Sequence, residues 1–264
     1  PAIELNLDFT PGYSDTISAL QTGDFNGDGI VDFLIYNPKK GLQIAYSDRR
    51  YAPDLLIGVD NGWGANLEFK YRASSDYSGL NLPANSSLPF VIPVISEVII
   101  KDKLGSVYNT TYNYSNGYYD PAEKEFRGFG YVSKIDPEGN LVENWFLQDD
   151  IFQGKLSQQT IKDSDGKIFS EIKNIWTNQS PHPGTYIVSL GETNQYTYDG
   201  SPSFKQKRVT FQYDSYGNQT SMKEWGDTEV NGDEREAISR YAYNLIDWLI
   251  SYPTHIYAQD ANGK

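Results

Sequence analysis

The feature that most constrains the fold is a turn signal, Asp-x-x-Gly, which recurs between strand-like segments. The Asp at the first position of such a turn accepts hydrogen bonds from backbone N–H groups, and the Gly at the fourth position adopts the positive φ that the turn needs. This combination is typical of a type I turn followed by a bulge, which joins two antiparallel strands. The signal is found at Asp102–Gly105, Asp136–Gly139, Asp163–Gly166, Asp214–Gly217 and Asp260–Gly263.

The segments between these turns alternate in steps of two and are rich in Tyr, Val, Ile, Thr and Phe. Examples are Asn109–Tyr114, Arg208–Tyr213 and Thr254–Tyr257. Such residues suit a pleated, half-buried strand. We therefore predict an all-β chain built as a long meander of antiparallel hairpins, with an ordinary β-sandwich as the alternative. One stretch, Glu234–Leu249, has helix-like spacing, and a short helical turn near its end stays open.

Composition excludes several classes of function. The 264 residues carry a formal net charge of −13, which argues against nucleic acid or anionic lipid as the main partner, because phosphate binding needs clustered Lys and Arg. The chain has no Cys, which removes disulfides, thiolate metal sites and cysteine nucleophiles. The longest apolar run, Phe90–Ile100, is interrupted by Pro, Ser and Glu and is shorter than the roughly 20 residues that span a bilayer, so we expect no membrane insertion.

One loop near the N-terminus carries metal-binding chemistry. Asp24, Asn26, Asp28 and Asp32 stand at positions 1, 3, 5 and 9 of a loop that has a Gly at its sixth position. Alternate oxygen ligands around a sharp glycine turn are what Ca²⁺ needs. An EF-hand is excluded for two reasons. It needs a Glu at the twelfth position of the loop, where this chain has Ile35, and it needs flanking helices, whereas the segment Phe33–Tyr36 favours a strand. We predict one structural Ca²⁺ held by Asp24, Asn26, Asp28, the carbonyl of Ile30, and Asp32. An Asx-rich turn without metal is the alternative.

This strand–loop–strand unit resembles the FG-GAP-type repeat, which occurs once per blade in integrin-like β-propellers. With one copy visible, the resemblance implies the last blade of a propeller. We place a boundary near Ile57–Gly58, before a corner rich in Gly and Asn. Residues 1–57 are then the last blade with its calcium-type loop, and residues 58–264 are a second unit.

A second resemblance covers nearly the whole chain. The segment Tyr118–Gly130, which reads YYDPAEKEFRGFG, resembles the signature of the middle region of the B component of bacterial Tc insecticidal toxin complexes and of their SpvB-like, TcdB-like and RHS relatives. Further segments resemble the same family in the same order, with Ser251 where the family usually has Gly: residues 57–71 with Ser75–Tyr77, Trp145–Asp150 with Gly154–Leu156, the YD-type repeat Tyr213–Thr220, and Trp248–Thr254.

The resemblance implies an architecture and a function. The end of a β-propeller would be followed by antiparallel YD-repeat hairpins that form part of a hollow RHS-type shell. The chain would be a structural part of a secreted toxin, a scaffold that docks to a translocation component and encloses a C-terminal effector for delivery to target cells. The family's effector and autoproteolytic aspartates lie in a part outside this sequence, as would any targeting signal, so no catalytic residue is carried over.

The residues themselves favour a scaffold over an enzyme. His182 stands between two prolines in an expected rigid loop, and Asp149 and Asp150 would point to opposite faces of a strand, which does not suit a pair of glycosidase carboxylates. We expect Arg127 to pair with Glu123 or Glu125, between two Phe rings that anchor the packing. An interaction hot spot at this aromatic–Arg cluster, and an extracellular calcium-stabilised adhesin or carbohydrate-binding module, remain alternatives.

Overall fold

The structure is a computed structural model that describes residues 19–38, 40–47, 54–76, 88–198, 201–260 and 263. Its described residues form two antiparallel β-sheets and contain no helix, which confirms the all-β prediction. No helix in this part of the chain is therefore long and apolar enough to cross a membrane. The first 18 residues of the predicted blade and Tyr77 of the corner motif lie outside the described residues.

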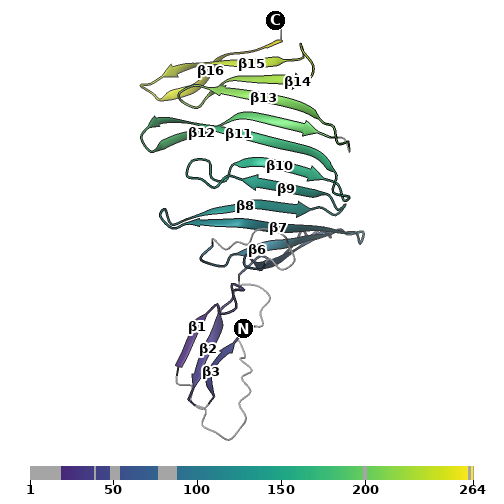
Figure 1. Cartoon of the computed structure of the whole chain (residues 1–264), viewed down its shortest axis with the longest axis vertical. Coiled ribbons are helices and arrows are strands. Elements are labelled where there is room, and N and C mark those ends of the chain that lie inside the picture. Colours follow the sequence, from purple (N-terminus) through teal and green to yellow (C-terminus); the bar gives the residue numbers. More distant parts are fainter. Residues whose placement is uncertain are drawn as a thin grey trace.

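The smaller sheet has three strands in the order β1–β2–β3. They are β1 (Ala19–Gly23), β2 (Asp32–Asn37) and β3 (Gly41–Ala45). The calcium-type loop joins β1 to β2, and Gly41, with a φ of 79°, helps to close the hairpin between β2 and β3. Ile30 at the end of the loop and Ile35 on β2 are buried. Figure 1 shows this sheet at one end of the molecule.

The larger sheet has thirteen strands, and each pairs antiparallel with the next one along the chain (Figure 1). It is therefore a continuous meander, as the turn signals predict. The strands are β4 (Gly58–Asp60), β5 (Asn66–Ala73), β6 (Pro93–Lys101), β7 (Val107–Asp120), β8 (Glu125–Ile135), β9 (Leu141–Phe146), β10 (Leu156–Lys162), β11 (Ile168–His182), β12 (Thr185–Thr197), β13 (Lys205–Tyr213), β14 (Gln219–Asp227), β15 (Arg235–Asn244) and β16 (Leu249–Asp260).

Four of the Asp-x-x-Gly signals form the expected turns; the two central residues of the fifth, Asp260–Gly263, lie outside the described residues. In the turn from β8 to β9, Gly139 N donates to the Asp136 carbonyl at 3.0 Å, and Asp136 Oδ1 accepts from Glu138 N at 3.0 Å and Asn140 N at 2.8 Å. The turns that begin at Asp102, Asp163 and Asp214 repeat this pattern, and all five signal glycines have positive φ.

The stretch with helix-like spacing forms strand β15 and the turn that leads to β16. Of Ile246–Leu249, where a helical turn is the alternative, the first three residues lie in this hairpin turn, which spans 245–248, and Leu249 begins β16. Trp248 takes a φ of 54° in it. The alternation of Tyr241 and Tyr243, which places both side chains on the same face of the strand, outweighs the helical spacing.

The larger sheet is a single layer. Among the described residues, the only buried apolar side chains are those of Ile30, Ile35, Val94, Ile99 and Tyr131. In a sandwich, a second sheet would cover one face and bury a continuous apolar core. No such second layer packs on the thirteen strands in the described part of the chain, so the sandwich alternative is wrong for these residues.

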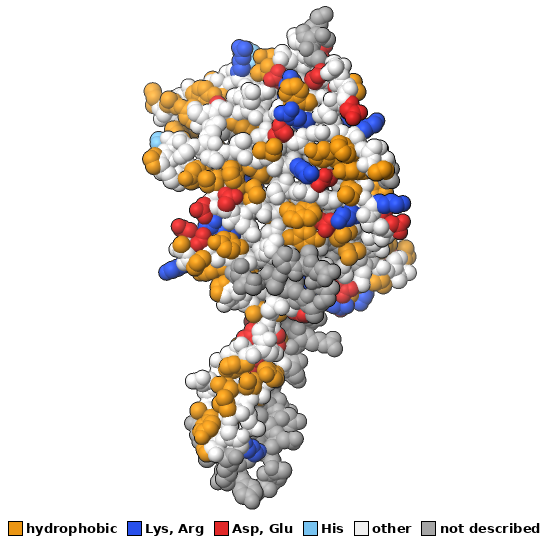
Figure 2. Space-filling model, viewed as in Figure 1, with side chains coloured by type: hydrophobic (Ala, Val, Ile, Leu, Met, Phe, Trp, Pro, Cys, Tyr) orange, Lys and Arg blue, Asp and Glu red, His pale blue; other side chains and the backbone are white. Residues whose placement is uncertain are grey.

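The two faces of this layer differ in chemistry. Apart from the pair between Arg127 and Asp120, the strand registers place the ion pairs formed between strand residues on one face, which we call the ion-pair face and which also carries the buried Ile99 and Tyr131. Its charged members are Glu68, Lys70, Glu97, Lys101, Glu143, Lys162, Glu171, Lys173, Glu192 and Arg208. The opposite face, which we call the apolar face, carries Val98, Val132, Val142, Ile161, Ile172, Val209, Phe211 and Met222, together with the charged side chains of Lys134, Lys207 and Glu224. Figure 2 shows acidic and basic side chains lying beside one another over the larger sheet.

Candidate functional site

The calcium-type loop is held in shape by its own side chains. Asp24 Oδ1 accepts hydrogen bonds from Gly27 N at 2.7 Å and Asp28 N at 3.1 Å, while its Oδ2 accepts from Gly29 N at 2.9 Å. The side-chain amide of Asn26 donates to Asp28 Oδ2 at 2.8 Å. Gly27 and Gly29 take φ values of 77° and 80°, which is why glycine is needed at both positions.

Asp32 anchors the loop from inside the smaller sheet. Its side chain is fully buried, with 0% of its surface exposed. Oδ2 accepts from Phe25 N at 3.0 Å, and Oδ1 accepts from Ser47 N at 2.9 Å. A buried carboxylate is costly unless it is hydrogen-bonded, and these two backbone donors supply that stabilisation. Asp32 therefore connects the beginning of the loop to the segment that follows β3.

These residues fit a calcium ion by type and only in part by arrangement. The loop offers carboxylate and amide oxygens around a glycine turn, as Ca²⁺ requires. Among the residues that the structure describes, however, no group of three or more His, Asp or Glu side chains lies close enough together to hold a metal ion. Both carboxylates that flank the loop accept backbone N–H groups, as in the Asx-turn alternative. Calcium binding by Asp24, Asn26, Asp28, Ile30 and Asp32 stays a prediction.

A second cluster lies where the hairpin β7–β8 meets the loop from β9 to β10. Arg127 on β8 has 3% of its side chain exposed. Its Nη2 lies 2.5 Å from Asp120 Oδ2, and its Nη1 bonds to Asp150 Oδ1 and, at 3.2 Å, to the Gln148 carbonyl. Its Nε has no hydrogen-bond partner. One guanidinium thus joins the end of β7, strand β8 and the loop after β9.

Gln148 completes this connection. Its side-chain amide donates to the carbonyls of Asn116 and Gly128, each at 2.9 Å. A Cβ at Gly130 would lie 2.7 Å from Gln148 Oε1 and 3.1 Å from the Cβ of Asn116, so only glycine leaves room for the Gln148 side chain. Gly128 has a φ of 78°. We call Asp120, Arg127, Gly128, Gly130, Gln148 and Asp150 the Arg127 cluster.

The cluster corrects two sequence-based expectations. Arg127 pairs with Asp120 and Asp150, not with Glu123 or Glu125, because the chain turns between β7 and β8 and brings the end of β7 alongside it. Asp149 and Asp150 lie in a loop, not on a strand; Asp149 Oδ1 accepts from the backbone N–H groups of residues 151 and 152. The two carboxylates are thus committed to separate structural bonds.

The electrostatics of the cluster favour its charged form. Hydrogen bonds from the backbone N–H groups of Glu123 and Ala122, together with the charge of Arg127, hold the pKa of Asp120 below its ordinary value. The bond to Asp150, with the charge of Asp120, raises the pKa of Arg127. Asp150 has 81% of its side chain exposed, so water screens the interaction between Arg127 and Asp150.

The aromatic packing expected beside Arg127 is present. The rings of Phe126 and Phe129 make an edge-to-face contact, with 5.7 Å between their centroids.

Sequence reasoning missed a third arrangement, at the turns β13–β14 and β15–β16. Tyr243 donates its hydroxyl to Asp214 Oδ2 at 2.7 Å, and this bond raises the pKa of Tyr243 to about 12. Asn218 donates to Asp214 Oδ2 at 2.8 Å and to the Ile250 carbonyl at 2.7 Å. The YD-type pattern signalled the turn β13–β14, but only the strand order shows that this turn bonds to the hairpin β15–β16.

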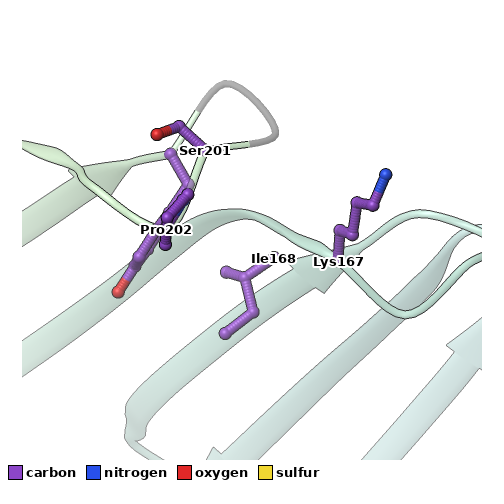
Figure 3. A pocket seen from close by; sticks show the side chains of 5 residues that line it. Lys167, Ile168, Ser201 and Pro202 are labelled. Carbon is purple, nitrogen blue, oxygen red and sulfur yellow. The ribbon is translucent and has the colours of Figure 1, made fainter.

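The remaining expectations concern possible catalysis. His182 ends β11 and is exposed, rather than lying in a rigid loop, since it pairs with Thr185 across the hairpin. A pocket of about 430 Å³ lies beside the start of β11, lined by Lys167, Ile168, Tyr198, Ser201 and Pro202. Figure 3 shows Lys167 and Ser201 on separate segments at its rim. The described residues that line it include no carboxylate and no imidazole.

Comparisons with known proteins agree on one family. Residues 7–160, more than half of the chain, match the family model described as the insecticide toxin TcdB middle/N-terminal region. No curated protein sequence matches the chain.

Similar solved structures include TcdB2–TccC3 without its hypervariable C-terminal region (17% identity, TM-score 0.72), the Photorhabdus luminescens Tc holotoxin pore with a TccC3 mutation (15%, 0.72) and TcdB2–TccC3–Cdc42 (15%, 0.68). Each likeness covers 92% of this chain and 17% of the solved chain. The chain thus spans about a sixth of the length of the chains it matches. At these identities the likeness establishes the fold.

Proposed function

The chain belongs to the family of the insecticide toxin TcdB middle/N-terminal region, and we propose that it is a non-catalytic, structural part of a secreted Tc toxin complex. In this proposal residues 1–57 are the end of a β-propeller that docks to a translocation component. Residues 58–264 are the start of a hollow RHS-type shell that encloses a C-terminal effector. Its partners are accordingly the translocation component and the effector-bearing component of the complex.

The single-layer meander carries this proposal. Thirteen strands follow one another in chain order and form one sheet with two surfaces and little core. A sheet of this kind gains little from burial on its own, because no second layer packs on its apolar face within the residues that the structure describes. As one wall of a larger closed shell, the same sheet separates an inside from an outside. One of its two faces, the ion-pair face or the apolar face, would then line the inside of the shell, and the other would lie on the outside.

The Arg127 cluster supports a structural role for the family motifs. Two of the sequence segments that resemble the family, Tyr118–Gly130 and Trp145–Asp150, meet at one guanidinium and one amide. All of their polar contacts run to backbone carbonyls or to carboxylates of neighbouring hairpins, which fixes the register between hairpins. We propose that these motifs set the geometry of the wall at this edge. No described group in the cluster is left in the arrangement of an acid, a base and a nucleophile.

Calcium enters the proposal as a stabilising ion. We propose that Asp24, Asn26, Asp28, the Ile30 carbonyl and Asp32 hold one Ca²⁺ that rigidifies the loop between β1 and β2. The ion would supply positive charge that offsets the mutual repulsion of three carboxylates. The role of the ion is structural, because all the charged ligands serve to neutralise it and none is left to present an open coordination position for a substrate.

Protease protection tests the proposed function. The complete toxin protein is assembled with its effector-bearing component, and the complex is treated with a protease of broad specificity. We expect the effector to resist digestion in the parent complex. Arg127→Met, which removes the bonds between hairpins, should make it digestible, while Arg240→Met, an exposed change on β15, should leave the protection intact. Equal digestion in the presence and absence of the shell-forming chain would overturn the proposal.

A further inference from the structure

We propose that the loop of residues 24–31 is the joint that fixes the smaller sheet on the larger one. In the described part of the chain, strands β1, β2 and β3 contact one another but no strand of the larger sheet. The loop instead reaches the corner at the end of β5. Ser75 donates its hydroxyl to the Gly27 carbonyl, and a Cβ at Gly29 would lie 3.1 Å from Val91 Cγ1. The joint thus uses the two glycines at the tip of the loop.

The loop side of the joint is rigid. The three hydrogen bonds that Asp24 accepts fix the backbone from Gly27 to Gly29, and Asp32 ties the loop to Phe25 and to the segment after β3. These bonds determine the direction of the Gly27 carbonyl. A rotation of the smaller sheet relative to the loop would break these hydrogen bonds. The loop tip and the smaller sheet therefore keep one fixed orientation relative to each other.

The receiving side is equally fixed. Ser74 is buried, its backbone N donates to the Ile92 carbonyl at 2.8 Å, and its Oγ accepts from Ile92 N at 3.0 Å. This pair holds Ser75 and Val91 next to each other at the corner. A cavity of about 440 Å³ between the loop and the end of β5, lined by Asn26, Asp28, Tyr71 and Asp76 among others, confines the close contact to the loop tip. Contact over a small area makes the joint sensitive to single substitutions.

The chain offers a matched pair of variants for the test. Gly29 and Gly41 have nearly the same φ, 80° and 79°, but a Cβ at Gly41 meets no atom within 4 Å. Gly29→Ala and Gly41→Ala therefore add the same backbone strain, and only Gly29→Ala pushes against Val91. Ser75→Ala removes the cross-joint hydrogen bond from the larger sheet and leaves the loop unchanged, so it remains informative if Gly29→Ala unfolds the smaller sheet.

Because the full chain has no Cys, spin labels can be placed at Leu20→Cys on β1 and Leu104→Cys in the turn after β6, which are 54% and 91% exposed. Pulsed electron paramagnetic resonance then measures the distance between the two sheets. We expect one narrow distance distribution in the parent and in Gly41→Ala, and a shifted or broadened distribution in Gly29→Ala and in Ser75→Ala. A broad distribution in the parent, or an unchanged one in both Gly29→Ala and Ser75→Ala, would overturn the proposal.

Discussion

Arg127 and Asp120 lie seven residues apart in sequence, and the hairpin between β7 and β8 brings Arg127 Nη2 to 2.5 Å from Asp120 Oδ2. The guanidinium is almost fully buried, and the same group bonds to the loop after β9. This one side chain therefore links the end of β7, strand β8 and the loop after β9. A single-layer sheet has few other means of fixing how its hairpins lie, which makes this pair more important than a surface ion pair.

Replacing Arg127 by Met should destabilise the protein. The Met side chain fills a similar volume, but it leaves Asp120 without its cation and the Gln148 carbonyl without its donor. Loss of one partner of a buried pair is costly, because the remaining charge keeps its desolvation penalty. We expect the melting temperature, measured by circular dichroism, to fall by about 5 °C or more. Arg240→Met on β15 is the control, and an equal change in both variants would contradict the role of the cluster.

Alkaline pH should destabilise the protein in part through Tyr243. Its pKa is raised to about 12 by the bond to Asp214, whereas an unfolded phenol ionises near its ordinary value of about 10. A raised folded-state pKa stabilises the protein below the unfolded value, and this stabilisation is lost as the pH rises through the folded value. Denaturant unfolding across this range should therefore show a shallower loss of stability in Tyr243→Phe than in the parent. Identical pH dependence would show that the Asp214 bond does not persist in solution.

Calcium should raise the melting temperature of the parent chain if the loop binds it. Isothermal titration calorimetry should detect one site, with a dissociation constant on the order of 10⁻⁴ to 10⁻³ M if the loop is typical of extracellular modules. Asp28→Ala should abolish the binding, while Asp165→Ala, in an Asp-x-x-Gly turn of the larger sheet, should retain it. A melting temperature that is independent of calcium in the intact protein would leave the Asx-turn interpretation as the correct one.

The outer edge of β16 should make the isolated chain associate as salt rises. In the described structure β16 pairs only with β15, and most of its twelve residues are exposed. Free backbone groups at an edge invite pairing, while the net charge of −13 opposes it until salt screens that charge.

Light scattering across a salt series should show association in the parent and less of it in Ile256→Lys, on β16. Ile246→Lys, a change in the turn before β16, should behave like the parent. A parent that stays monomeric at every salt concentration would contradict this prediction.

The sequence predicted the features that depend on local chemistry. Asp136 and Gly139 form their turn because the donor, the acceptor and the positive φ all lie within four residues. The strand alternation and the family resemblance likewise depend on neighbouring residues. The all-β fold and the hairpin meander followed from these alone, and the structure confirms both.

The sequence did not predict the features that depend on distant residues. Arg127 was expected to bond to the nearest carboxylates, but its partner Asp150 is 23 residues away, and only the strand order brings the two together. Tyr243 bonds to Asp214 across 29 residues for the same reason. Strand alternation alone did not distinguish a single layer from a sandwich, because it suits both; only the family resemblance implied a shell. The proposed calcium ligands are close together in sequence, and their types and spacing are visible there. The affinity for the ion depends on how their oxygen atoms are arranged in space, which the spacing does not determine.

The most direct test asks whether the larger sheet is the wall of a closed shell. Lys173 on β11 and Gln195 on β12 are both exposed and point to opposite faces, since Lys173 is paired with Asn194, the neighbour of Gln195. The chain has no other thiol, so Lys173→Cys and Gln195→Cys each report on one face. In the isolated chain a bulky maleimide should label both variants. In the assembled toxin complex we predict labelling of one variant and protection of the other, and equal labelling of both would contradict the account.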